Sequence, residues 1–165
     1  MEKLPELIRE TQRKWAEAKA KAQRECEGSA RYDVAGKLSQ CSMFHEDENL
    51  ESMCALIFTP QGSEFVTAYG FPDLATFRKF KRYRPERYGV YIDCGRIELS
   101  DPKKVCLVGN TTATINCAET AGNRIIALCG ARATVVASGY SVVKIEKDEA
   151  SKVTYTTNGH AKVLL

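Results

Sequence analysis

The chain has 165 residues, of which 44% are hydrophobic, 27% charged and 8% aromatic. This is the composition of an ordinary globular protein, and it excludes the collagen-like, disordered and disulfide-scaffold classes. The net charge of +3 is too small to indicate a nucleic-acid or membrane partner by itself.

Cysteines and histidines form no recognisable metal or disulfide pattern. The seven cysteines, at positions 26, 41, 54, 94, 106, 117 and 129, are at least 11 residues apart, and the only histidines are His45 and His160. Zinc sites normally use closely spaced ligand pairs, so we expect no metal and no other cofactor. Separated cysteines favour a reducing compartment, and the first residues carry no signal-peptide or membrane-span pattern. We expect a cytoplasmic or virion-associated protein without membrane contact.

Residues 1–28 are predicted to form one long amphipathic helix that ends at Gly28. Leu4, Ile8 and Trp15 lie on one apolar stripe, and good helix formers fill most other positions. Two interpretations remain open. The stripe packs on the rest of this chain, or Leu4, Ile8 and Trp15 dock the helix on a partner, including a second copy.

Residues 29–86 are predicted to form a small helical region. A loop-rich connector, with a short strand or turn near 37–44, precedes a helix over 49–58 that Asn49 caps. TPQG at 59–62 ends this helix, and Ser63 caps a short one over 64–69. A third helix starts near Pro72 and ends at Arg84, because a residue that precedes proline is disfavoured in the helical conformation.

From Tyr88 onward the composition changes to Val, Ile, Thr, Tyr and Cys, and residues 87–165 are predicted to form a β-repeat domain. We expect nine short strands at VYID, RIEL, KVCLV, TATIN, RIIALC, ATVVAS, SVVKIE, KVTYTT and AKVLL. No helical pattern follows residue 88.

The strongest signal in this half is a degenerate repeat, with copies that begin at 109, 122, 130, 139, 149 and 159. Each unit is one strand and one turn, and two units of about ten residues make one coil of a β-solenoid. The predicted fold is therefore α+β, with a helical region before a short β-solenoid. An antiparallel β-sandwich is the alternative, because it uses the same alternation and turn residues.

The alternation also predicts which side chains face the interior of the solenoid. We expect inward positions at Ala133, Val135, Val142, Thr154 and Val163, and outward positions at Arg132, Lys144, Lys152 and Lys162. A last strand at AKVLL offers an unpaired edge that needs a cover or a partner. This favours a homo-oligomer.

The runs GNTTATI at 109 and GARATVVASGYSVVKI at 130 resemble the G-N-A-T-V-x-A repeats of short β-solenoid proteins from phages, prophages and mobile elements of gut anaerobic bacteria. FPDLATFRKFKRYRPERYGVYIDCGRIEL resembles the segment that precedes such repeats. The resemblance covers residues 65–165. It implies a fold and a genomic setting, and it implies no reaction and no catalytic residues.

Residues 77–88 form a basic-aromatic segment that contains six cations and a single acid, Glu86. The cations are Arg78, Lys79, Lys81, Arg82, Arg84 and Arg87. Cations interleaved with aromatic rings are suited to bind phosphates and to stack on unpaired bases. The alternative is a helix that covers the open end of the solenoid through Phe77 and Phe80, with the cations in solvent.

No nucleophile elbow, P-loop or dinucleotide motif is present, so we expect no enzymatic activity. His45, beside the acidic residues 46–48, is expected in a surface loop. The favoured function is a structural or protein-interaction module, encoded by a phage or mobile element, with a rigid β-platform and a helical docking segment. The alternative is a nucleic-acid-binding accessory protein that acts through residues 77–88.

Overall fold

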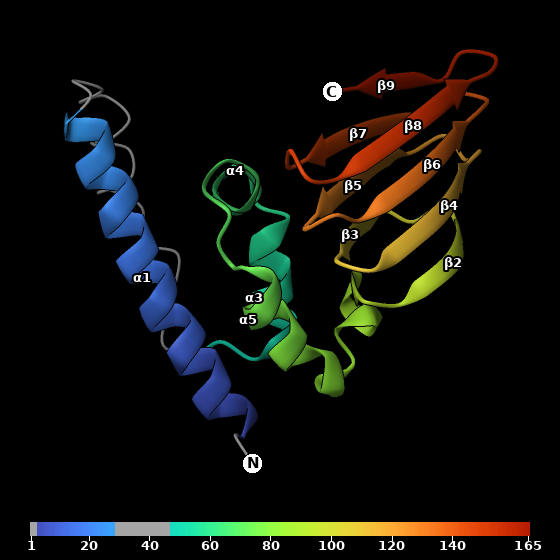
Figure 1. Cartoon of the computed structure of the whole chain (residues 1–165). Coiled ribbons are helices and arrows are strands. Elements are labelled where there is room, and N and C mark those ends of the chain that lie inside the picture. Colours follow the sequence, from blue (N-terminus) through green and yellow to red (C-terminus); the bar gives the residue numbers. More distant parts are fainter. Residues whose placement is uncertain (1–2, 29–46) are drawn as a thin grey trace.

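The computed structural model describes residues 3–28 and 47–165, in which helices precede a β-solenoid (Figure 1). The predicted α+β fold is confirmed. The short strand or turn expected near 37–44, and His45, lie outside the described residues. The helices are α1 (Leu4–Gly28), α3 (Leu50–Ile57), α4 (Pro60–Tyr69) and α5 (Leu74–Phe80), followed by the 3-10 turns η1 (Lys81–Tyr83) and η2 (Pro85–Tyr88).

All nine predicted strands are present, and the described residues contain no helix after η2. They are β1 (Val90–Ile92), β2 (Gly95–Ser100), β3 (Lys104–Val108), β4 (Thr111–Cys117), β5 (Gly122–Leu128), β6 (Arg132–Ala137), β7 (Val142–Lys147), β8 (Lys152–Thr157) and β9 (Lys162–Leu164).

The strands alternate between two parallel sheets, which makes the β-part a solenoid. Sheet A has the order β1-β3-β5-β7-β9, and sheet B has the order β2-β4-β6-β8. Val105 pairs with Ile125, so one coil takes 20 residues, whereas the first coil, from Val90 to Cys106, takes 16. Every pairing is parallel, so the antiparallel sandwich is wrong.

The space between the two sheets is filled by small and branched apolar side chains. Ile115 and Val135 on sheet B and Ile125 on sheet A are fully buried there. Burial of such a side chain contributes about 1.5–3 kcal/mol each. Because each coil stacks only on its neighbours, this column of side chains holds the solenoid together.

The inward and outward predictions are correct except at two positions. Ala133, Val135 and Val163 face inward, and the four predicted outward cations are exposed. Val142 and Thr154 point outward instead. At β7 the buried Ser141 donates to the carbonyl oxygens of Cys117 and Ser138, which fixes the corner so that Val143 is the inward residue. A strand shifted by one residue exchanges its two faces.

Helices cover the outer face of sheet A. Its first three strands carry a buried outward row, Ile92–Val108–Leu128, which packs in one cluster with Phe77 and Phe80 of α5. A sheet covered on both faces needs apolar residues at successive positions, which explains the continuous apolar runs of β3 and β5. The two phenylalanines therefore lie on this face, whereas we expected them to cover the open end of the solenoid.

Side-chain caps set the helix boundaries. Asn49 caps α3 as predicted and forms a capping box with Ser52. The prediction for the next helix was wrong, because α4 begins at Pro60 and Thr59 is its N-cap, accepting from the Gly62 amide. Proline suits a first helical position, since its missing N–H needs no partner there. Ser63 is consequently a buried residue inside the helix.

The apolar stripe of α1 packs on the body of this chain. Trp15 is 1% exposed, stacks on Phe65 at 5.9 Å between ring centroids, and meets Phe71 edge-on at 5.8 Å. Ile8 is buried and Leu4 is half-buried against the same cluster. The structure therefore uses Leu4, Ile8 and Trp15 for intrachain contacts, as in the first of the two interpretations.

Candidate interaction surfaces

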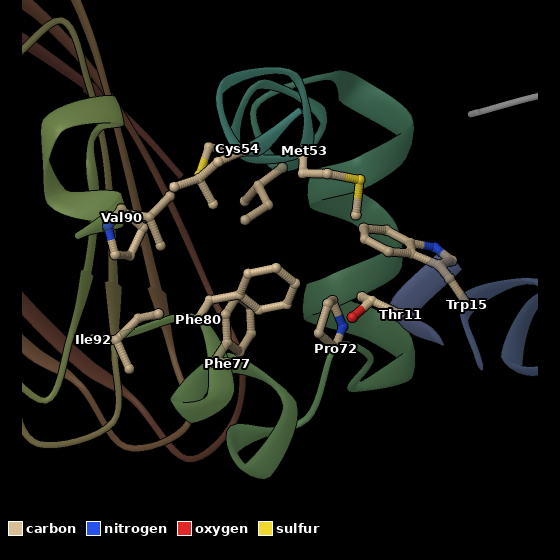
Figure 2. Close-up of a pocket in the computed structure, with 12 residues that line it drawn as sticks. Thr11, Trp15, Met53, Cys54, Pro72, Phe77, Phe80, Val90 and Ile92 are labelled. Carbon is tan, nitrogen blue, oxygen red and sulfur yellow. The ribbon is translucent and has the colours of Figure 1, made fainter. Parts of the chain in front are cut away.

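The cavity between the helices and sheet A is small and apolar. Its volume is about 40 Å³, and it lies between α1, α3, α5 and β1 (Figure 2). Phe77 and Phe80 line it on one side and Trp15 on the other. The hydroxyl of Thr11, also in the lining, donates to the carbonyl of Leu7 within its own helix. A space of this size and polarity is a gap in packing that presents no converging polar groups.

Burial makes the described thiols poor nucleophiles. It raises the pKa of Cys54 to about 12, and of Cys117 and Cys129 to about 11. Burial also raises the pKa of Cys106 well above its ordinary value, and that of Cys94 to a smaller extent. Since the thiolate is the reactive form, these residues act as small apolar or corner residues.

Charged and imidazole groups form no cluster suited to a metal in the described residues, where no three His, Cys, Asp or Glu side chains converge. The ring of His160 stacks on the exposed Tyr140 one coil earlier, with centroids 4.7 Å apart and planes at 10°. Within residues 3–28 and 47–165, no helix combines the length and apolar character needed to cross a bilayer.

The basic-aromatic segment lies on α5, η1 and η2, and half of its cations pair with acids of this chain. Arg78 pairs with Asp93 at 2.7 Å, Lys79 with Glu10 at 3.4 Å, and Arg84 with Glu86 at 3.3 Å. The hydrogen bond from Arg78, with the amide of Asn110, lowers the pKa of Asp93.

The remaining three cations of the segment bond to its own residues or to the adjacent corner. Lys81 donates to the Asp93 carbonyl at 2.7 Å, Arg82 to the Tyr83 hydroxyl at 2.6 Å, and Arg87 to the Tyr83 carbonyl at 3.3 Å. All six nevertheless stay exposed. The segment is thus a fixed, solvated surface that stands beside the corner between β1 and β2.

Sequence reasoning missed the outer face of sheet B, which no described element covers. Its side chains form three rows across β2, β4, β6 and β8. The first row is Arg96–Thr112–Arg132–Lys152, the second Glu98–Thr114–Thr134–Thr154 and the third Ser100–Asn116–Val136–Thr156. All except Val136 are exposed. The 20-residue period places Lys152 beside Arg132, so the coil length alone contained this signal.

The last coil presents a second open surface. Strands β8 and β9 each have a neighbouring strand on one side only among the described residues. Tyr155 pairs with the fully buried Val135, yet it is 43% exposed because the described residues place no further coil above it. Leu164 is 51% exposed on β9. This end combines free backbone groups with apolar side chains.

Comparisons with protein-family models, with curated proteins and with solved structures found no match to this chain.

Proposed function

We propose that this chain is a non-catalytic interaction module whose rigid solenoid docks through its last coil on a protein partner, in the first place a second copy of itself. One observation carries the proposal. In the described part of the chain, every large hydrophobic side chain classed as exposed lies between residues 140 and 165. They are Tyr140, Val142, Tyr155, Leu164 and Leu165.

Exposed edge strands support the same surface. An unpaired β-edge presents a row of backbone N–H and C=O groups that a further strand can satisfy. At this end the same edge carries the inward-facing Val153, Tyr155 and Val163, which are only partly covered. Docking of a strand satisfies the backbone and buries these side chains together.

The opposite end of the solenoid is less suited to docking. Turn η2 contacts β1 there, and among the described residues this end carries no exposed large hydrophobic side chain, whereas Tyr155 and Leu164 are exposed on the last coil. Two copies that meet through their last coils form a closed, two-fold pair, whereas head-to-tail docking extends into filaments. We therefore favour a symmetric homo-oligomer. A phage or mobile-element setting stays a prediction.

Analytical ultracentrifugation of the whole chain across the micromolar range tests this proposal. Tyr155→Lys places a charge at an inward edge position, and Leu164→Lys places one on the outward side without altering the core. The matched control is Thr134→Lys, which adds the same charge to the inner strand β6. Reversible association in the wild type and control, lost in both edge variants, supports the proposal. A chain that stays monomeric, or associates equally in all variants, contradicts it.

Nucleic-acid binding through residues 77–88 alone is less favoured, because three of the six cations are neutralised within the chain.

A further inference from the structure

The outer face of sheet B carries positive charge that the chain does not neutralise. Arg96, Arg132 and Lys152 occupy one row, and all three are exposed. None of their side chains has an ion-pair or hydrogen-bond partner among the described residues. This contrasts with the basic segment, where each cation contacts an acid, a carbonyl or a tyrosine.

The row is continuous with the basic segment around one corner of the solenoid. Arg78 and Lys81 both bond to Asp93, at 2.7 Å in each case. Asp93 precedes Arg96 by only three residues, so their Cα atoms lie within about 11 Å. Arg78 neutralises the Asp93 carboxylate. No uncompensated negative charge at Asp93 therefore lies between the basic segment and the row of cations on sheet B.

The face beside the row is flat and rich in hydroxyl groups. Thr114, Thr134 and Thr154 form the neighbouring row, and Glu98 is the single acid among the twelve positions of the described face. With strands about 4.8 Å apart, the row from β2 to β8 is about 14 Å long. It offers cations and neutral donors along one line.

We propose that this face, together with the corner at η1, binds the sugar-phosphate backbone of a single-stranded nucleic acid. Arginine forks and threonine hydroxyls are the usual donors to phosphate oxygens. On η1 the exposed Arg82 lies over the ring of the half-buried Tyr83, 4.9 Å from its centroid, and a base that reaches this corner can stack on the guanidinium plane. A flat protein face does not enter the groove of a nucleic-acid duplex. An extended single strand of nucleic acid, by contrast, can lie along the row of cations. The row and the proposed docking edge share strand β8, but Lys152 lies on the outer face of sheet B, whereas Tyr155 is on the inward side.

Fluorescence anisotropy with labelled single-stranded DNA and RNA tests the inference in a salt series on the full chain. The variant Arg96→Gln/Arg132→Gln/Lys152→Gln removes the row. The matched control, Lys21→Gln/Lys103→Gln/Lys104→Gln, removes three exposed cations elsewhere. We expect the row variant to bind at least about tenfold more weakly at low salt, and its slope of log K against log salt to fall by about 2. The control should retain most of the affinity.

Three outcomes overturn the inference. They are the absence of binding at low salt, an equal loss in the row variant and the control, and binding of duplex DNA or of heparin while single strands are not bound. Circular dichroism and thermal melting check that both triple variants are folded. We expect both to fold, because all six substituted side chains are exposed and none contributes to the core.

Discussion

Arg124 holds the helices against sheet A at the boundary of the area that they cover. Its removal is expected to weaken the contact between the helices and the sheet. It lies on β5 with its side chain 18% exposed, and it donates to the carbonyl of Phe58, to Ser63 Oγ at 2.7 Å and to Glu146 Oε1 at 2.7 Å. Phe58 and Ser63 belong to the junction of α3 and α4. One guanidinium therefore ties two helices to two strands.

The magnitude follows from what Arg124→Ala leaves behind. The change leaves the Glu146 carboxylate and the Phe58 carbonyl without the donor that they share. The Glu146 side chain is only 17% exposed. Removal of one partner of a largely buried pair costs about 3–5 kcal/mol. Lys144 still contacts Glu146 at 3.1 Å, so we expect the lower end of this range. For a chain of this length, about 3 kcal/mol lowers Tm by about 6–12 °C.

The same pair gives a pH dependence with a defined sign. Burial raises the pKa of Glu146, but hydrogen bonds from Ser63, Lys144 and Arg124 outweigh this effect and hold the pKa below its ordinary 4.5. A lowered pKa in the folded state stabilises the fold above pH 4.5, and this contribution is lost as the pH falls below that value. Urea unfolding at pH 7 and below pH 4 measures it.

The control is Lys144→Ala, which removes a 52% exposed cation from the same carboxylate and should cost below about 1 kcal/mol. The double variant Arg124→Leu/Glu146→Leu should recover the part of the loss that comes from the unpaired carboxylate, because apolar replacement of a buried pair is often neutral, whereas the Phe58 carbonyl still lacks its donor. The reasoning is refuted if Arg124→Ala costs no more than Lys144→Ala, or if its stability depends on pH as steeply as that of the wild type.

Two further predictions concern the corners and the thiols. Gly109 has a φ of +66°, and an added Cβ meets the Asp93 carboxylate and Leu74, whereas Gly130 has a φ of +88° and open space around it. Gly109→Ala should therefore be less stable than Gly130→Ala by at least about 1 kcal/mol in urea unfolding, and equal losses would contradict the clash. Cys54 and Cys106 should react with a disulfide reagent at pH 8 far more slowly in the folded chain than in urea, as read by peptide mapping. Rapid native labelling of either one would show that its pocket opens.

The strand positions could be predicted because β-branched runs and turn residues were both regular. It was harder to predict which residues of each strand point inward. This depends on which residue the preceding corner places first on the inner side. At Ser141 and Ser151 a buried hydroxyl bonds across the turn, and the residue that follows points outward. The apolar character of Val142 predicts an inward position, but the Ser141 hydroxyl before it takes the inward place and Val142 points outward.

The layering of helices on one sheet had a signal in the sequence. KVCLV and RIIALC are continuous apolar runs, whereas the Thr111–Cys117 strand is buried and exposed at alternate positions. Continuous runs are typical of strands covered on both faces. The pattern of apolar residues along each strand therefore distinguishes sheet A, which the helices cover, from sheet B, which is open. The contact of Trp15 with Phe65 and Phe71 had no comparable signal, because it joins residues about 50 positions apart in a packing specific to this fold.

The candidate surfaces could be predicted only in part, because a cluster of charge in the sequence does not show which charges are paired. The six cations of residues 77–88 are adjacent in the sequence, yet Asp93 and Glu10 reach them from other elements. The cations of the row on sheet B are far apart in the sequence, yet Arg132 and Lys152 are neighbours in space and only Thr112 separates Arg132 from Arg96. Only the coil length relates them, and the 16-residue first coil hides Arg96 from a strict 20-residue period.

The composition of each row also determines where the cover of the solenoid ends. On sheet A the outward row that begins with Val90, Cys106 and Ile126 is apolar, and its next member is Glu146. The helices end their contact there, at the bond between Glu146 and Arg124. On sheet B the outward positions are polar from the first coil, so a helix gains little apolar burial on that face. The polar face is thus a consequence of the sequence, and it presents charged and hydroxyl groups that the apolar cavity of about 40 Å³ lacks. This is the physical reason for placing recognition on the surface of the solenoid.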